Sequence, residues 1–299
     1  MVKARSRDFG AMLFTAGSAI GAFAASPAPP QTVHFTAADG RTELIAYLFA
    51  PEGAGRHPAV IMLHGRSGPY GANVNTDCKQ VSPGQESPCN ATTLSKRHAM
   101  WGAYWVQHGY AALLVDSFGP RGRAHGYGRH THEAADRIAV NERTVRPLDA
   151  EAALAWLAAR PDVHADRVML QGWSNGASTA LNAMHRQAQT PTSSAAGALR
   201  FRAALVLYPA CGPRALISQR YTANAEVWAF LGGNDDEVSP TVCASVLDKA
   251  RGGPVAVTLY PGATHGFDDP GAARQAVAAN RTAKADAMAR AAALFDALP

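Results

Sequence analysis

The segment DRVMLQGWSNGAS, residues 166–178, decides the fold of this chain. Its apolar run ends at Gly172, and Ser174 then lies between Gly172 and Gly176. The residues that follow, 175–189, have the composition of a helix. A G-x-S-x-G sequence between a strand and a helix is typical of a sharp turn that strains the serine backbone and exposes its hydroxyl above a sheet. The alternative is a tight turn without a chemical role.

The chain on both sides of this segment alternates between strand and helix patterns. We expect strands at 32–37, 41–51, 57–65, 110–119, 166–174, 201–210, 225–233 and 254–262, and helices at 92–109, 132–161 (interrupted near Pro147), 175–189, 239–253 and 272–298. The first two strands, joined by Asp39-Gly40, indicate an antiparallel hairpin at a sheet edge. The later, mostly apolar strands are typical of parallel strands buried on both faces. The sequence predicts an α/β fold: about eight strands in a mostly parallel sheet, covered by helices on both faces.

Three chemically suited side chains follow strands of this predicted sheet. Ser174, Asp235 and His265 occur in that order, each just beyond the carboxyl end of a strand, where sites of such sheets lie. Ser174 would be the nucleophile, His265 would take its proton, and Asp235 would hold the imidazole in the required tautomer. Asp236 and Glu237 compete with Asp235 for the role of the acid.

An attack on a carbonyl also needs two hydrogen-bond donors for the oxyanion. The backbone N–H of Asn175 at the start of the helix is one candidate, and the backbone N–H of Arg66, after the strand 57–65, is the other.

An Arg- and His-rich loop at 119–133 follows another strand and would border the same site. Arg121, Arg123 or Arg129 could bind a substrate carboxylate, and a solvated loop is the alternative. Metal binding by His125, His130 and His132 is disfavoured because no acidic ligands are spaced with them, so we expect no metal.

These motifs together resemble the α/β-hydrolase superfamily and, within it, the dienelactone hydrolase family. The resemblance covers about residues 40 to 299 and rests on VIMLHG, GYAALLVDSFGPRG, RPLDAEAALAWLAARP, GWSNGA, GGNDDEV and GATHGF. The last two match the acid and histidine loops of the family, which implies Asp235 as the acid and His265 as the base. Characterised dienelactone hydrolases carry a cysteine nucleophile, whereas this chain has Ser174, so a serine esterase acting on a small-molecule ester without a cofactor is implied.

Two other classes of function remain open. One keeps the three residues but cleaves a peptide or amide bond, as in prolyl-oligopeptidase-like enzymes. The other is a non-catalytic binding protein on a hydrolase fold.

The N-terminal residues have the pattern of a secretory signal peptide. Basic residues in MVKARSRD precede a short apolar stretch, and Ala22 to Ala24 form an A-x-A cleavage pattern. We therefore expect a signal peptide at 1–24, an exported periplasmic or secreted protein, and no membrane span in the mature chain. A transmembrane anchor is the alternative. One catalytic domain would occupy 25–299, with a loop insertion at 66–91.

The four cysteines indicate disulfides, and the charge distribution limits the classes of partner that we expect. In an oxidising compartment Cys78, Cys89, Cys211 and Cys243 favour disulfides, and we expect the pairs Cys78–Cys89 and Cys211–Cys243, with zinc as the alternative. The net charge of +5 is spread along the 299 residues, so no nucleic-acid partner is expected.

Overall fold

The structure, a computed structural model, describes residues 29–74, 78–129, 131, 134–190 and 199–298. The expected signal peptide at 1–24 and two of the candidate metal ligands, His130 and His132, lie outside these residues.

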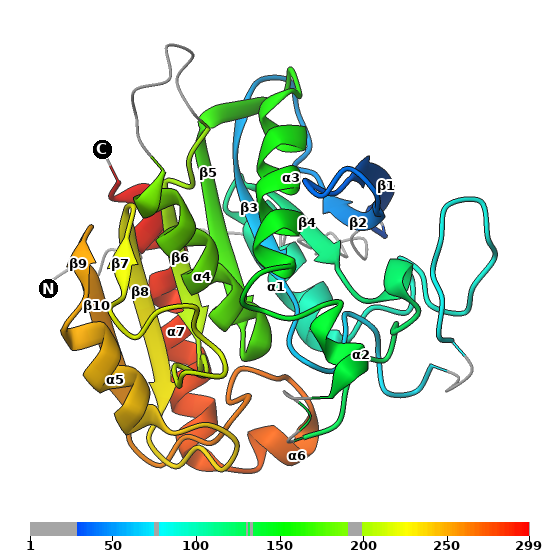
Figure 1. Cartoon of the computed structure of the whole chain (residues 1–299). Coiled ribbons are helices and arrows are strands. Elements are labelled where there is room, and N and C mark those ends of the chain that lie inside the picture. Colours follow the sequence, from blue (N-terminus) through cyan, green and yellow to red (C-terminus); the bar gives the residue numbers. More distant parts are fainter. Residues whose placement is uncertain (1–28, 75–77, 130, 132–133, 191–198, 299) are drawn as a thin grey trace, which may run out of the picture.

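One eight-stranded sheet forms the centre of the molecule, in the order β1-β2-β4-β3-β5-β6-β8-β10 (Figure 1). Its strands are β1 (Gln31–Thr36), β2 (Glu43–Phe49), β3 (His57–Leu63), β4 (Ala111–Asp116), β5 (Val163–Trp173), β6 (Ala203–Leu207), β8 (Glu226–Gly232) and β10 (Val255–Tyr260). Strand β2 pairs antiparallel with β1 and with β4, and all other pairs are parallel. The predicted fold class and the antiparallel hairpin at the edge are confirmed.

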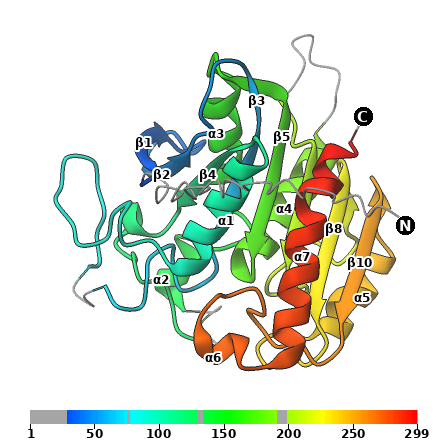
Figure 2. The same cartoon turned by 180° about the vertical axis from the view of Figure 1, so that it is seen from behind.

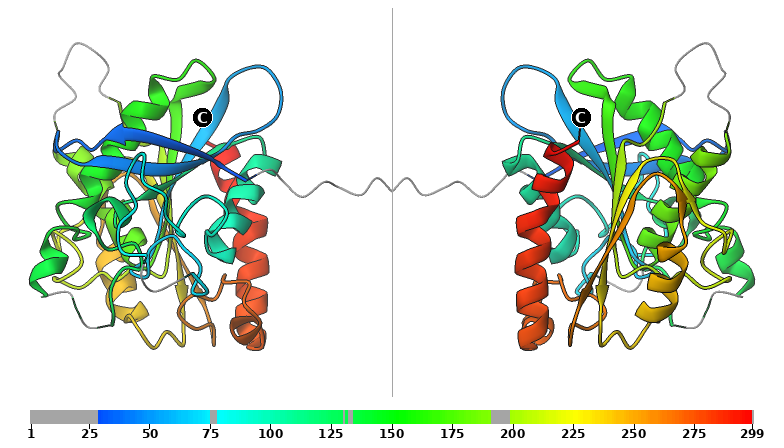
Figure 3. Two further views of the ribbon diagram at one scale, coloured as in Figure 1. Left: turned by 90° about the vertical axis from the view of Figure 1, so that its right-hand side faces the viewer. Right: turned by 90° about the vertical axis from the view of Figure 1, so that its left-hand side faces the viewer.

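Helices cover both faces of the sheet, as expected. Helices α1 (Lys96–Gln107) and α7 (Ala278–Asp296) lie on one face, and α3 (Arg146–Ala158), α4 (Asn175–Gln189) and α5 (Pro240–Asp248) on the other (Figures 2 and 3). Alternate residues of β3 enter the two cores: Ile61 packs with the α3–α4 side and Met62 with the α1–α7 side. The mostly apolar sequence of the strand follows from this burial on both faces. Among the described residues, no helix has both the length and the apolar character to cross a membrane.

Several helices differ from their predicted extents. The helix expected over 239–253 ends at Asp248 as α5, and Arg251–Gly252 form a short strand instead. The helix expected over 132–161 is two: α2 (Ala135–Ile138) and α3, with Pro147 in the first turn of α3 rather than at an interruption. A proline fits there because the first helical N–H groups have no acceptor within the helix. The expected C-terminal helix begins as α6 (Ala272–Gln275) and restarts as α7.

Smaller elements that the sequence did not indicate complete the fold. A 3₁₀ turn (Gly119–Arg121) follows β4, and β7 (Thr222–Ala223) pairs with β9 (Arg251–Gly252) in a separate two-stranded sheet. Two-residue strands carry too few side chains to produce an alternating pattern, so they leave no signal in the sequence.

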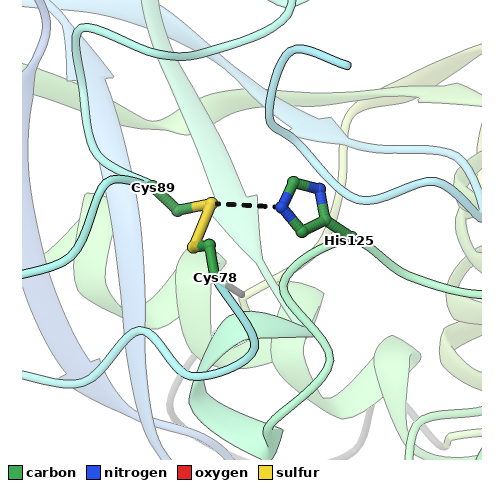
Figure 4. A group of neighbouring side chains, drawn as sticks. All are labelled: Cys78, Cys89 and His125. Carbon is green, nitrogen blue, oxygen red and sulfur yellow. Dashed lines mark hydrogen bonds between the residues drawn. A yellow bond between two sulfur atoms is a disulfide. The ribbon is translucent and has the colours of Figure 1, made fainter. Parts of the chain in front are cut away.

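Both expected disulfides are present. Cys78 is bonded to Cys89, and Cys211, after β6, is bonded to Cys243 in α5. Figure 4 shows the His125 ring beside the first disulfide, with Nε2 3.9 Å from the Cys89 sulfur. Within the part of the chain that the structure describes, these three residues bring together donor atoms of the kind that bind metal ions. Because the two sulfurs are bonded to each other, neither is a thiolate, and this trio would become a Cys₂His donor set only after reduction.

The disulfides are expected to account for all four cysteines of the purified protein. Their sequence separations of 11 and 32 residues correspond to about 3 and 4 kcal/mol of stabilisation through restriction of the unfolded chain. Thiol titration in denaturant should find no free thiol before reduction and four after it. Urea unfolding of a Cys211→Ser/Cys243→Ser double variant should give a free energy of unfolding about 4 kcal/mol lower than that of the wild type. Four free thiols before reduction would contradict both pairings.

Candidate active site

The turn between β5 and α4 holds Ser174 in a strained backbone conformation. Its φ of 53° and ψ of −114° lie outside the regions that most residues adopt. A Cβ on Gly172 would lie 2.3 Å from the Gly176 carbonyl oxygen, and one on Gly176 would lie 1.9 Å from that of Leu63. A side chain at either position would clash with backbone atoms, so both positions require glycine. The strain at Ser174 is typical of a functional turn.

Ser174, His265 and Asp235 form one hydrogen-bonded chain. The Ser174 Oγ lies 3.0 Å from His265 Nε2, and His265 Nδ1 lies 2.8 Å from Asp235 Oδ2. The serine comes from the turn after β5, the aspartate from the loop after β8, and the histidine from the loop after β10. In the tautomer with a proton on Nδ1, the imidazole donates to the carboxylate and Nε2 accepts the hydroxyl proton.

The local structure separates Asp235 from the two acidic residues that follow it. The side chain of Asp235 is 1% exposed, and its other oxygen accepts the backbone N–H groups of Glu237 and Val238, each at 2.9 Å. Asp236 points outward, with its side chain 60% exposed. Only Asp235 is both buried and hydrogen-bonded to the imidazole Nδ1 of His265.

Glu237 approaches the other side of the imidazole, which the sequence did not indicate. Its Oε2 lies 3.8 Å from His265 Nε2 and accepts two hydrogen bonds from the Arg66 guanidinium, at 3.1 and 3.2 Å. Arg129 donates to its other oxygen at 2.7 Å. The carboxylate is thus held between two arginines.

Both candidate oxyanion donors lie beside Ser174. Arg66 follows β3, and Asn175 is the first residue of α4, where a backbone N–H has no acceptor within the helix. Arg66, Ser174 and Asn175 line one cavity together.

Two cavities meet at Ser174, and both have polar walls. The smaller, about 60 Å³, lies toward α4 and the acid loop, and is lined by Arg66, Arg129, Arg137, Glu142, Ser174, Asn175, Ser178, Ala210, Asp236, Glu237 and Val238. The larger, about 290 Å³, lies toward the start of α1 and the histidine loop, and its walls include Tyr70, Arg97, Tyr208, His265 and Arg274.

The arginines proposed from the 119–133 loop have different surroundings from those expected. Arg121 donates two 2.8 Å hydrogen bonds to the buried Asp149, and Arg123 pairs with Asp136. Neither residue lines the two cavities at Ser174, whereas Arg129 lines the smaller one. Two of the three candidates therefore hold the loop against the helices that follow it. The sequence could not identify Asp149 and Asp136 as their partners, because they lie on separate elements.

The buried carboxylate of Asp268 anchors the histidine loop, the segment that follows β10. Asp268 is fully buried and accepts the indole N–H groups of Trp101 and Trp173, each at 2.8 Å, and the hydroxyl of Tyr208 at 2.5 Å. Burial raises the pKa of Tyr208, which keeps this hydroxyl a donor. Asp268, three residues after His265, thus ties the histidine loop to Trp173, the residue before Ser174.

Comparison with known protein families identifies the family to which the chain belongs. The model of the dienelactone hydrolase family matches residues 95–298. A comparison with curated proteins found no match.

Three solved structures share the fold. A dienelactone hydrolase-like promiscuous phosphotriesterase from metagenomic libraries is 20% identical, with a TM-score of 0.61, covering 90% of this chain and 97% of its own. A putative dienelactone hydrolase from Klebsiella pneumoniae is 17% identical, with a TM-score of 0.61 and coverages of 89% and 98%. Esterase 2 of Thermogutta terrifontis is 17% identical, with a TM-score of 0.58 and coverages of 88% and 93%.

The family match covers more than half of the chain, and these structures share its α/β-hydrolase architecture over nearly their whole length. The chain belongs to the dienelactone hydrolase family and is a carboxylic ester hydrolase.

Proposed function

We propose that this protein is an exported serine esterase that cleaves small carboxylic esters through an acyl-enzyme. The observation that carries this proposal is the hydrogen-bonded chain from Ser174 through His265 to Asp235, at the end of a strained turn. The Ser174 oxygen attacks the ester carbonyl carbon while His265 Nε2 takes the hydroxyl proton. The Asp235 carboxylate stabilises the imidazolium that forms.

The carbonyl oxygen becomes an oxyanion in this step, and the backbone N–H groups of Arg66 and Asn175 are the proposed donors to it. When the tetrahedral intermediate collapses, the bond to the alcohol breaks and His265 returns the proton to the leaving oxygen. Water then attacks the acyl-Ser174 carbonyl with His265 as its base, which releases the carboxylic acid and restores the serine. The reaction needs no cofactor.

The cavities at Ser174 favour short, polar substrates. The smaller cavity has charged walls that include Arg129 and Glu237, and the larger contains Arg97 and Arg274. A long alkyl chain placed there would remove water from these charged groups without replacing its hydrogen bonds, which costs free energy. We therefore propose a compact ester with polar groups on both sides of the scissile bond.

Ser174→Ala tests the proposal directly. The variant should fold as the wild type does and should lose ester hydrolysis by a factor on the order of a million, since the nucleophile is absent. Turnover is measured on p-nitrophenyl esters of increasing acyl length and on matching anilides; wild-type rates should fall with length and be lowest on anilides. Ser245→Ala, which removes an exposed serine on α5 that lines neither cavity at Ser174, is the control. Hydrolysis by Ser174→Ala within tenfold of wild type would overturn the proposed nucleophile, and faster cleavage of anilides would favour a peptidase.

The two adjacent aspartates give a second test. Asp235→Asn should lower kcat by about ten-thousand-fold at neutral pH, because an amide no longer stabilises the imidazolium or the required tautomer. Asp236→Asn should have a mild effect, since its side chain is 60% exposed. Measuring kcat for both variants side by side separates them. The reverse ranking would assign the acid to Asp236.

Export is part of the proposal and is tested separately. The basic residues, apolar stretch and A-x-A pattern of residues 1–24 support a cleaved signal, and two disulfides are typical of an oxidising compartment. Expression with the native N-terminus in a Gram-negative host should give a soluble product lacking about 24 residues by intact mass. A full-length, membrane-bound chain would indicate an anchor instead.

A further inference from the structure

Arg146, at the start of α3, is a fully buried arginine behind the serine turn. Its side chain is 0% exposed, and its guanidinium carbon lies 4.9 Å from the centre of the Phe118 ring. Burial lowers the pKa of Arg146 to about 10, although the carboxylates of Asp149 and Glu142 oppose this shift. The group therefore still carries its charge at neutral pH. Burying a charge is costly unless it forms good polar contacts, so its partners are informative.

The two terminal nitrogens of Arg146 contact the two segments that carry the proposed oxyanion donors. Nη2 donates to the carbonyl oxygen of His64 at 2.8 Å, two residues before Arg66. Nη1 donates to the side-chain oxygen of Asn175, whose backbone N–H is the other donor. One guanidinium thus links the loop after β3 to the first residue of α4.

The geometry of a guanidinium suits this task. Its planar fork fixes the distance and the angle between two acceptors, which a lysine ammonium on a flexible stem does not. The segments that it joins are already in close contact, because Gly176 packs against the carbonyls of Leu63 and His64. That contact sets the approach of the backbones, and Arg146 adds a hydrogen-bonded restraint on the orientation of each segment.

We propose that Arg146 is a positioning residue that holds the oxyanion hole in its working geometry by fixing the loop after β3 against the first residue of α4. This inference rests on the proposed function of Ser174, Arg66 and Asn175. Arg146 itself does not touch the substrate. We expect Arg146 to stabilise the transition state rather than the bound substrate, because the oxyanion gains its charge only after the serine attacks.

The first experiment compares steady-state kinetics of Arg146→Gln and Arg146→Lys with wild type on a short p-nitrophenyl ester. Both variants should lower kcat by about 100-fold or more, comparable to the loss of one oxyanion donor, with KM within about threefold. Lysine should not rescue activity, because it retains the charge but loses the fork. Circular dichroism at the assay temperature establishes that each variant is folded.

A trifluoromethyl ketone gives a second readout. The Ser174 oxygen adds to its carbonyl carbon, the proton passes to His265, and the carbonyl electron pair becomes an oxyanion that occupies the hole. The inhibition constant should rise in parallel with the fall in kcat/KM. A merely structural role would not produce this parallel, since a folded enzyme with an intact hole would bind the inhibitor normally.

Arg121→Gln is the matched control. Arg121 belongs to the same buried group of charges and donates two hydrogen bonds to Asp149, but neither oxyanion segment is among its contacts. It should retain kcat within about threefold of wild type. If Arg146→Gln does not fold, Asn175→Ala decides, because it releases one segment from Arg146 while keeping the backbone donor; its kcat should fall at least tenfold.

The outcomes separate this inference from the proposed function. An active Ser174→Ala variant would overturn the function itself. An inactive Ser174→Ala together with Arg146→Gln within tenfold of wild-type kcat would overturn the positioning role alone. Rescue by Arg146→Lys, an effect confined to KM, or an equal loss in Arg121→Gln would also overturn it.

Discussion

The packing of Gly176 against the backbone of β3 is the constraint on which the site depends. A Cβ at this position would lie 1.9 Å from the Leu63 carbonyl oxygen and 2.5 Å from that of His64. Because glycine has no side chain, the turn after β5 and the start of α4 can approach the end of β3 this closely. Ser174, Asn175 and the loop that carries Arg66 are thereby brought to one cavity.

Buried polar groups then hold the remaining parts of the site around that contact. Asp268 joins the tryptophan before Ser174 to the histidine loop, and Arg146 joins the loop after β3 to α4. Both charged groups are fully buried. Asp268 accepts three hydrogen bonds and Arg146 donates two, and these bonds offset part of the cost of removing each group from water. Glu237, which accepts hydrogen bonds from Arg66 and Arg129, links the loop after β3 to the 119–133 loop. The loops that carry Ser174, Asp235 and His265 come from distant parts of the sequence, and these contacts fix them relative to one another.

The long, strongly patterned elements were predictable from the sequence, and the short ones were not. The strands of the central sheet are mostly apolar runs, and both disulfide pairs are as expected. Pro147 was expected to interrupt a helix but begins one, since the sequence pattern does not distinguish a break from a first turn. Arg121 was one of three candidates for binding a substrate carboxylate, with a solvated loop as the alternative. In the structure it donates to Asp149, a pairing between separate elements that no local sequence pattern indicates.

The sequence alone determined the architecture and the identities of Ser174, Asp235 and His265 as the residues to examine. Local chemistry suffices there, because glycines around a serine and a polar residue after a buried strand act through their immediate neighbours in the chain. Only the tertiary structure decided which side chains surround the site: Glu237 beside the imidazole of His265, Asp268 bonded to Tyr208, and Arg146 between the loop after β3 and α4. These contacts join residues far apart in the sequence, and their geometry exists only once the strands have paired and the helices have packed on both faces of the sheet.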